Sequence, residues 1–181
     1  MKRFIHILCL NVLALATTFA GTISIQPSAT TLPLGSPLSL DVNVSGISDL
    51  YAWQFDIAFN PAVLSANNVT EGALFSSVGV FFSPGTIDNT AGTITFIGDS
   101  LSGPGPGIST DGTLAQIVFT AIGPGSSVID LSNVILLDSN LNDITASAVS
   151  GSVTVVPEPS YLTVLGASFI VLLARLRRSP R

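Results

Sequence analysis

The stretch that most constrains the fold is Leu50–Leu64, in which apolar and polar residues alternate. One set of alternate positions is aromatic or aliphatic: Tyr51, Trp53, Phe55, Ile57 and Phe59. A period of two places these side chains on one face of a β-strand and leaves the other positions on the opposite face. Asn60 and Pro61 then end the strand, because proline has no N–H for the ladder. We therefore predict a strand whose aromatic face, including Trp53, lies in the core.

Short runs of the same kind fill residues 21–155, separated by turns rich in glycine and proline. Beside the strand at 50–59, we expect strands at 22–26, 38–45, 63–69, 86–89, 93–97, 113–122 and 144–155, and a strand covered on both sides that comprises 127–131 and 133–137. Residues 27–37 and 102–112 are expected to be loops, and Gly151 to mark a bulge. Turns every 8–12 residues or so favour an antiparallel sandwich or barrel of about nine strands.

Charge is divided sharply along the chain. Residues 21–155 contain ten Asp and Glu residues and no Lys or Arg, so their formal charge is −10. All six basic residues lie outside this segment: Lys2, Arg3, Arg175, Arg177, Arg178 and Arg181. A domain without cations cannot neutralise phosphates, which argues against nucleic-acid binding. Solubility outside the cell explains the acidity most simply, with calcium or a basic partner as the alternatives.

The middle segment also lacks the side chains of common catalytic sites. The only histidine is His6 and the only cysteine is Cys9, so neither a Ser-His-Asp site nor a His/Cys zinc site can form in residues 21–155. No pair of carboxylates is spaced so as to suggest a glycosidase. We therefore predict that the protein is not an enzyme and needs no cofactor.

Residues 1–20 have the three parts of a secretory signal peptide. Lys2 and Arg3 form the positive region, an apolar run follows, and Thr18 and Ala20 are the small residues before a cleavage site at Gly21. A retained membrane anchor is the alternative, although the apolar run is short for a span.

The C-terminal tail, residues 156–181, changes character. A stiff Pro157-Glu158-Pro159 hinge precedes Tyr161–Ala174, which has no charged residue, and an arginine cluster follows at Arg175, Arg177 and Arg178. Fourteen helical residues span roughly 21 Å against a hydrocarbon core of about 30 Å, so the predicted transmembrane helix is marginal. The arginines place its end in the cytoplasm.

This tail resembles the sorting signal of PEP-CTERM proteins in its Pro-Glu-Pro motif, apolar helix and basic cluster, taken in that order at the terminus. The resemblance implies processing by an exosortase, a membrane transpeptidase-like enzyme that removes the helix. It also implies a Gram-negative bacterium that makes exopolysaccharide. The protein would pass through the inner membrane, stay anchored there briefly, and end at the cell surface or in the extracellular matrix.

Several short motifs occur in order along the middle segment: Trp53–Asp56 with Phe59–Leu64, then Gly92–Phe96, Gly112–Ala115 with Ile117 and Phe119, and Gly151–Val155. In these motifs the segment resembles the cohesin domain and related carbohydrate-binding modules. The resemblance implies a nine-stranded antiparallel jelly-roll sandwich over residues 21–155, flanked by the signal helix and the tail helix. It also implies a non-catalytic module that binds a dockerin-like protein.

Gln54 and Asp56 are the candidate partner-binding residues. They lie on the strand face opposite the aromatic side chains. In cohesins the outer face of this sheet contacts the partner, so the resemblance assigns that role to this pair. The alternative is that both side chains are simply solvated.

Asp138, Asn140 and Asn142 carry oxygen ligands at positions 1, 3 and 5 of a loop, as in a calcium site. Position 6 is Asp143 where such a loop needs glycine, and position 12 is Val149 where it needs glutamate. We therefore predict a polar turn without a metal, with calcium as the alternative.

Three functions remain open on the sequence. The first is a secreted interaction module of the cohesin type. The second is an exopolysaccharide-binding module, which would need exposed aromatic side chains. Phe75, Phe81 and Phe82 are the candidates for these. The third is a purely structural matrix protein.

Overall fold

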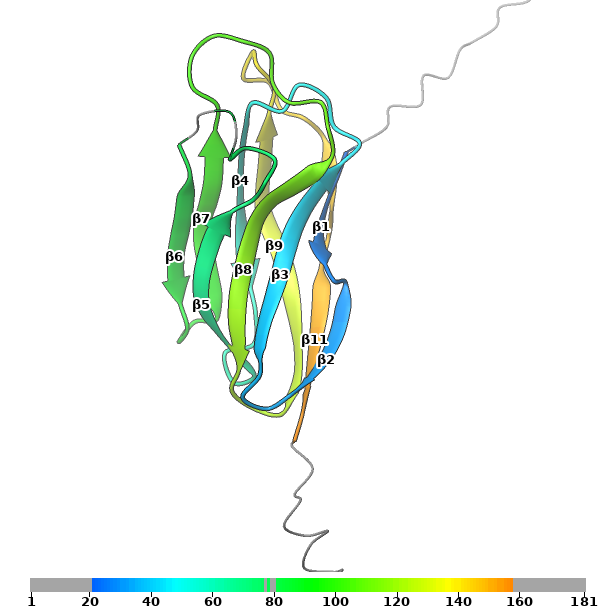
Figure 1. The fold of residues 1–181 in the computed structure, drawn as a ribbon, viewed down its shortest axis with the longest axis vertical. Helices are drawn as coiled ribbons and strands as arrows, with labels where there is room; N and C mark the ends of the chain where they lie inside the picture. Colours follow the sequence, from blue (N-terminus) through cyan, green and yellow to red (C-terminus); the bar gives the residue numbers. More distant parts are fainter. Residues whose placement is uncertain (1–20, 77, 79–80, 158–181) are drawn as a thin grey trace, which may run out of the picture.

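The computed structural model describes residues 21–76, 78 and 81–157, which form two β-sheets packed face to face (Figure 1). The five-stranded sheet has the order β10-β1-β3-β8-β5, and the six-stranded sheet has the order β2-β11-β9-β4-β7-β6. The strands are β1 (Gly21–Gln26), β2 (Ala29–Pro33), β3 (Pro37–Ser45), β4 (Ala52–Ala58), β5 (Leu64–Glu71), β6 (Ser83–Asp88), β7 (Thr93–Ser100), β8 (Gly112–Ala121), β9 (Gly125–Leu137), β10 (Ala146–Val149) and β11 (Gly151–Val156). The prediction of an all-β sandwich is confirmed.

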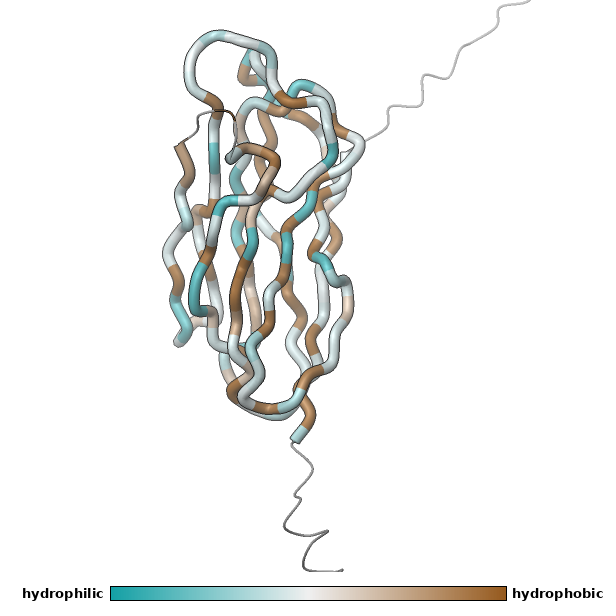
Figure 2. The backbone as a smooth tube through the Cα atoms, in the orientation of Figure 1, coloured by the Kyte–Doolittle hydropathy of each residue, from teal (hydrophilic) through white to brown (hydrophobic). Residues whose placement is uncertain are grey.

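The core lies between the two sheets and is built from alternate residues of the strands. Apolar and polar positions alternate visibly along the backbone in Figure 2. In β4, Trp53, Phe55 and Ile57 are buried while the residues between them are only half-buried. Trp53 stacks on Phe55 at 5.3 Å between ring centroids, and Phe75 meets it edge-on at 6.2 Å. The predicted strand and its buried face are therefore confirmed for Trp53, Phe55, Ile57 and Phe59. Tyr51, predicted on the same face, precedes β4 and is only half-buried.

The two ends of the described domain differ from the prediction. Residues 27–37, expected to be a loop, contain the short strand β2, and the single strand expected at 144–155 is divided into β10 and β11. The described residues thus form eleven strands rather than about nine. Both terminal segments cross from the five-stranded to the six-stranded sheet, and β1 pairs with β10 and β2 with β11 in parallel. The sandwich is therefore not wholly antiparallel.

Gly151 marks this crossing rather than a bulge. It is the first residue of β11, directly after the break that follows β10. A Cβ atom at this position would lie 2.7 Å from Cγ2 of Ile25, so only glycine fits as the chain passes between the sheets. The predicted bulge is wrong because a crossing strand and a bulge both select glycine for close backbone approach.

Two predicted segments lie mostly or wholly outside the described residues. The signal peptide covers residues 1–20, and the sorting tail covers residues 156–181, of which only Val156 and Pro157 are described. Glu158, Pro159, Arg175, Arg177 and Arg178 lie outside the described part. In the ranges that are described, no helix is long and apolar enough to cross a membrane.

Candidate functional site

The outer face of the six-stranded sheet contains an irregularity centred on Asp56. β4 lies between β7 and β9, and its register against both neighbours shifts beside Asp56. On the β7 side the shift leaves Phe96 without a ladder partner on β4. On the β9 side it leaves Asn133 without one. The two strands on either side of β4 therefore each have a bulge beside the same residue, Asp56.

The Asp56 carboxylate holds both bulges. Its Oδ1 accepts a hydrogen bond from the backbone N–H of Phe96 at 2.8 Å, and its Oδ2 accepts one from Nδ2 of Asn133 at 2.7 Å. Both bulge residues have positive φ, +61° at Phe96 and +49° at Asn133. A bulky aromatic residue is strained in this left-handed region, and such strain persists only where its surroundings enforce it. The carboxylate supplies that constraint.

The consequence is an aromatic side chain turned toward solvent. Phe96 is 65% exposed, whereas its neighbour Ile97 is fully buried in the core. Ile135 of β9 is also exposed, and it pairs in register with Gln54 of β4. We call the surface formed by Gln54, Asp56, Phe96, Asn133 and Ile135 the bulge face.

The two predicted partner-binding residues thus have different positions. Gln54 is half-buried on the bulge face, between the backbones of β7 and β9, as the alternation predicted. Asp56 lies on the same face, but both of its oxygens already accept hydrogen bonds from within the domain. Its evident role is to position Phe96. The sequence analysis missed Phe96, although two adjacent apolar residues, Phe96 and Ile97, interrupt the alternation of Thr93–Ile97 and are a signal of a bulge.

The predicted calcium residues form a capped turn. Oδ1 of Asp138 accepts hydrogen bonds from the backbone N–H groups of Asn140 and Asn142, each at 2.8 Å. The bonds from Asn142, first its backbone and then its side chain, hold the pKa of the Asp138 carboxyl below its usual value. Among the described residues, no three His, Cys, Asp or Glu side chains are grouped so as to hold a metal ion.

Of the three candidate aromatic residues for sugar stacking, only one is freely exposed. Phe75 is fully buried against Trp53, so that expectation is wrong. Phe82 is partly buried and packs on the core, whereas Phe81 is 77% exposed. Phe81 is therefore the one candidate of the three whose ring is open to a ligand.

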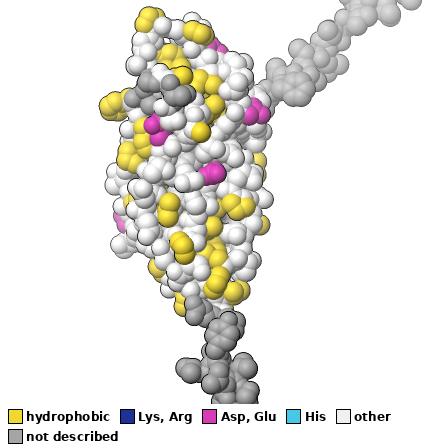
Figure 3. All heavy atoms as spheres, viewed as in Figure 1, with side chains coloured by type: hydrophobic (Ala, Val, Ile, Leu, Met, Phe, Trp, Pro, Cys, Tyr) yellow, Lys and Arg dark blue, Asp and Glu magenta, His cyan; other side chains and the backbone are white. Residues whose placement is uncertain are grey.

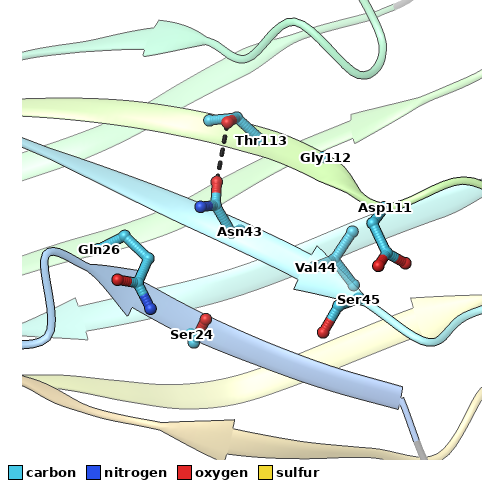
Figure 4. Close-up of a pocket in the computed structure, with 8 residues that line it drawn as sticks. All are labelled: Ser24, Gln26, Asn43, Val44, Ser45, Asp111, Gly112 and Thr113. Carbon is cyan, nitrogen blue, oxygen red and sulfur yellow. Dashed lines mark hydrogen bonds between the residues drawn. The ribbon is translucent and has the colours of Figure 1, made fainter.

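The opposite outer face, on the five-stranded sheet, carries a shallow polar groove of about 420 Å³. Figure 4 shows its lining, contributed by β1, β3, β8 and the residue before β8: Ser24, Gln26, Asn43, Val44, Ser45, Asp111, Gly112 and Thr113. Oγ1 of Thr113 donates to Oδ1 of Asn43 at 2.8 Å, and Oδ1 of Asp111 accepts from the N–H of Gly46 at 2.8 Å. The groove offers hydroxyl, amide and carboxylate groups and no cation.

Together, the sandwich and its bulge face define the class of a β-sandwich module that presents a strand-built surface for recognition. Residues 22–155 match the cohesin domain family, so the chain belongs to that family. Cohesin domains are non-catalytic protein–protein interaction modules. No match was found among curated proteins.

Solved structures of cohesins share this fold. A non-cellulosomal cohesin from the archaeon Archaeoglobus fulgidus is 20% identical with a TM-score of 0.63, covering 80% of this chain and 96% of that one. A type II cohesin from the cellulosome of Acetivibrio cellulolyticus is 18% identical with a TM-score of 0.63, covering 74% and 95%. A type I cohesin–dockerin complex from Clostridium thermocellum is 18% identical with a TM-score of 0.61, covering 76% and 99%. At these identities the likeness establishes the fold alone.

Proposed function

We propose that this chain is a dockerin-binding interaction module whose partner docks on the bulge face. The observation that carries the proposal is Phe96, an exposed aromatic side chain held in a strained backbone conformation by Asp56. Strain of this kind concentrates at functional sites, and aromatic residues dominate the energetics of protein interfaces. Membership of the cohesin family and the dockerin complexes of its relatives support the choice of partner.

The chemistry of the surface specifies the partner further. Phe96 and Ile135 offer an apolar centre, which calls for an apolar recess on the other side. The domain around them carries ten carboxylates and no Lys or Arg. Basic residues around the recess would therefore complement it and speed association at low salt.

The test is a binding titration of the full chain with type I and type II dockerin domains as probes. Phe96→Ala should weaken the measured affinity at least about tenfold, because truncating a central aromatic anchor removes most of its contact area. The matched control is Gln26→Ala on the opposite face, which should bind as the parent does. If Phe96→Ala binds every dockerin that the parent binds with unchanged affinity, the bulge face is not the docking surface.

A second candidate function is binding to a neutral exopolysaccharide in the polar groove of the five-stranded sheet. Its hydroxyl and amide groups can hydrogen-bond to sugar hydroxyls, but no aromatic side chain lines it for stacking. Affinity electrophoresis through gels containing polysaccharide tests it: Gln26→Ala should lose any retardation, whereas Phe96→Ala should keep it. A protein retarded by polysaccharide and bound by no dockerin would reverse the order of the two candidates.

Display outside the cell is proposed from the two terminal segments of the sequence. Residues 1–20 would direct export, and the two prolines of Pro157-Glu158-Pro159 disfavour a helix, so this motif would be accessible to an exosortase-type enzyme. Intact mass of protein from the cell surface should correspond to a chain beginning at Gly21 and ending near Pro159. Replacing the three hinge residues with alanine should trap the precursor in the inner membrane, whereas Pro104→Ala with Pro106→Ala should leave processing unchanged. A surface species that retains residues 161–181 would contradict this proposal.

A further inference from the structure

Asp99 occupies a position where a carboxylate is unexpected. It lies on the inward side of β7, two residues after Ile97, and only 5% of it is exposed. No other charged side chain of the described residues is buried to this degree. Its Oδ1 accepts a hydrogen bond from the N–H of Ser100 at 2.7 Å, but its Oδ2 is buried and has no donor.

Glu71 meets Asp99 from the other sheet. It is the last residue of β5, at the edge of the five-stranded sheet, and its Oε1 is likewise buried without a donor. Glu71 lies close enough to Asp99 for its charge, and hydrogen bonding between the two carboxyls, to raise the pKa of Asp99. β5 and β6 are the edge strands of the two sheets and pack against each other at one side of the sandwich (Figure 1), so the pair lies near the place where the two sheet edges meet.

The surroundings of Asp99 supply no positive charge. β4 places the uncharged Trp53 beside it in register, and β6 pairs with this part of β7 through the uncharged Ser83. Beyond Glu71, Asp41 of β3 shares the lining of a small pocket of about 190 Å³ with it. Residues 21–157 contain no Lys, Arg or His, so every charged group near the pair is an acid.

Two facing carboxylates without a cation repel each other in a buried site, so ionising both is unfavourable and a proton is held there more tightly than on an exposed carboxyl. Burial, and then the neighbouring Glu71 charge and hydrogen bond, raise the pKa of Asp99 from 3.8 to about 6, against the opposing bond from Ser100. A calcium ion would instead require six to eight oxygen ligands. The described residues bring no third acidic side chain to this pair.

We propose that a proton shared between Glu71 and Asp99 joins the two sheets at the β5–β7 edge, and that its loss near neutral pH loosens this edge. The raised pKa means that the folded state binds the proton more tightly than the unfolded state. The stabilisation is therefore fully present below about pH 4 and is lost as the pH rises through about 6. Between pH 4.5 and 7.5 the unfolding equilibrium constant should rise on the order of 30-fold from this group alone.

The test measures urea unfolding of the full chain from pH 4.5 to 7.5. Asp99→Asn removes the titrating carboxyl while keeping its shape, so it should abolish the 30-fold rise. Glu71→Gln removes only the neighbouring charge, so it should make the rise smaller, because burial alone still raises the pKa of Asp99. Asp143→Asn, a change at an exposed acid, should leave it unchanged. An Asp99→Asn or Glu71→Gln protein that folds and keeps the parent's pH dependence overturns the proposal.

A second readout reports on the pair directly and does not depend on the variants folding. Trp53 is the only tryptophan of the chain and is the register partner of Asp99. Its fluorescence in the folded parent should titrate with a midpoint near pH 6, without unfolding. A flat fluorescence profile overturns the proposal. So does a rise in melting temperature at pH 7.5 with millimolar calcium but not with magnesium, which would assign the pair to a cation.

Discussion

The two outer faces of the sandwich differ in how their polar side chains are hydrogen-bonded. On the five-stranded sheet the polar side chains pair with one another across strands: Thr113 with Asn43, Gln116 with Asp41, and Thr120 with Asn67. Figure 3 shows this side, with scattered carboxylates and no basic side chain among its described atoms. On the six-stranded sheet Asp56 bonds instead to two strained bulges and leaves Phe96 exposed. The polar side chains of the five-stranded face already have hydrogen-bond partners, so they need none from another molecule. The six-stranded face leaves the Phe96 ring in water, so a partner that buries this ring would be bound favourably.

The largest effect on this contrast should come from Asp56→Ala. It removes two charged hydrogen bonds and leaves the Phe96 N–H and the Asn133 amide unpaired, which should lower the free energy of unfolding by about 3 kcal/mol. Urea denaturation measures it. The matched control is Asp41→Ala on the other face, where one side-chain bond is lost and the change should stay below about 1 kcal/mol. Equal losses in the two variants would mean that the bulges do not depend on the carboxylate.

Phe96→Gly should separate stability from recognition. Glycine adopts positive φ without strain, so this variant should be about 1 kcal/mol more stable than the parent although it loses a side chain. Dockerin binding should weaken as in Phe96→Ala. Thr95→Gly is the control: its backbone has no positive φ, so thermal unfolding should report a loss of stability there. Destabilisation by Phe96→Gly would show that its backbone is not strained.

The smallest effect should come from Asn43→Ala on the polar face. The Thr113 hydroxyl loses its acceptor at 2.8 Å but can turn to solvent, so the free energy of unfolding should fall by about 0.5 kcal/mol. Affinity for dockerin should not change. A loss of affinity larger than that of Phe96→Ala would move the recognition surface to this face.

The features that could be predicted from the sequence are those that depend on the local alternation of apolar and polar residues. The buried parity of β4, with Trp53 and Phe55 inward, follows from side-chain period alone. The bulges could not be located in this way, because a bulge depends on how one strand is aligned with strands that are distant in the chain. Phe96 and Asn133 become neighbours of Asp56 only once β7 and β9 are paired with β4.

The acid pair escaped prediction for a related reason. The strand expected at 93–97 ends before Asp99, whereas β7 continues to Ser100 and carries Asp99 inward by the same alternation. Extending the strand would have placed a carboxylate in the core. Its partner Glu71 lies in the other sheet, so no sequence spacing relates the two residues.

The crossing of both terminal segments between the sheets has a consequence for the order in which the chain can fold. Among the strands that the structure describes, β2 pairs only with β11, and β11 lies between β2 and β9. A chain that emerges from its N-terminus therefore holds β2 unpaired until residues 151–156 follow, more than a hundred residues later. Such long-range pairing is slow to form, because the chain loses the entropy of closing a long loop before the contacts between the strands can form. The six-stranded sheet can be completed only after residues 151–156 have left the ribosome, which makes β11 the last strand to enter it.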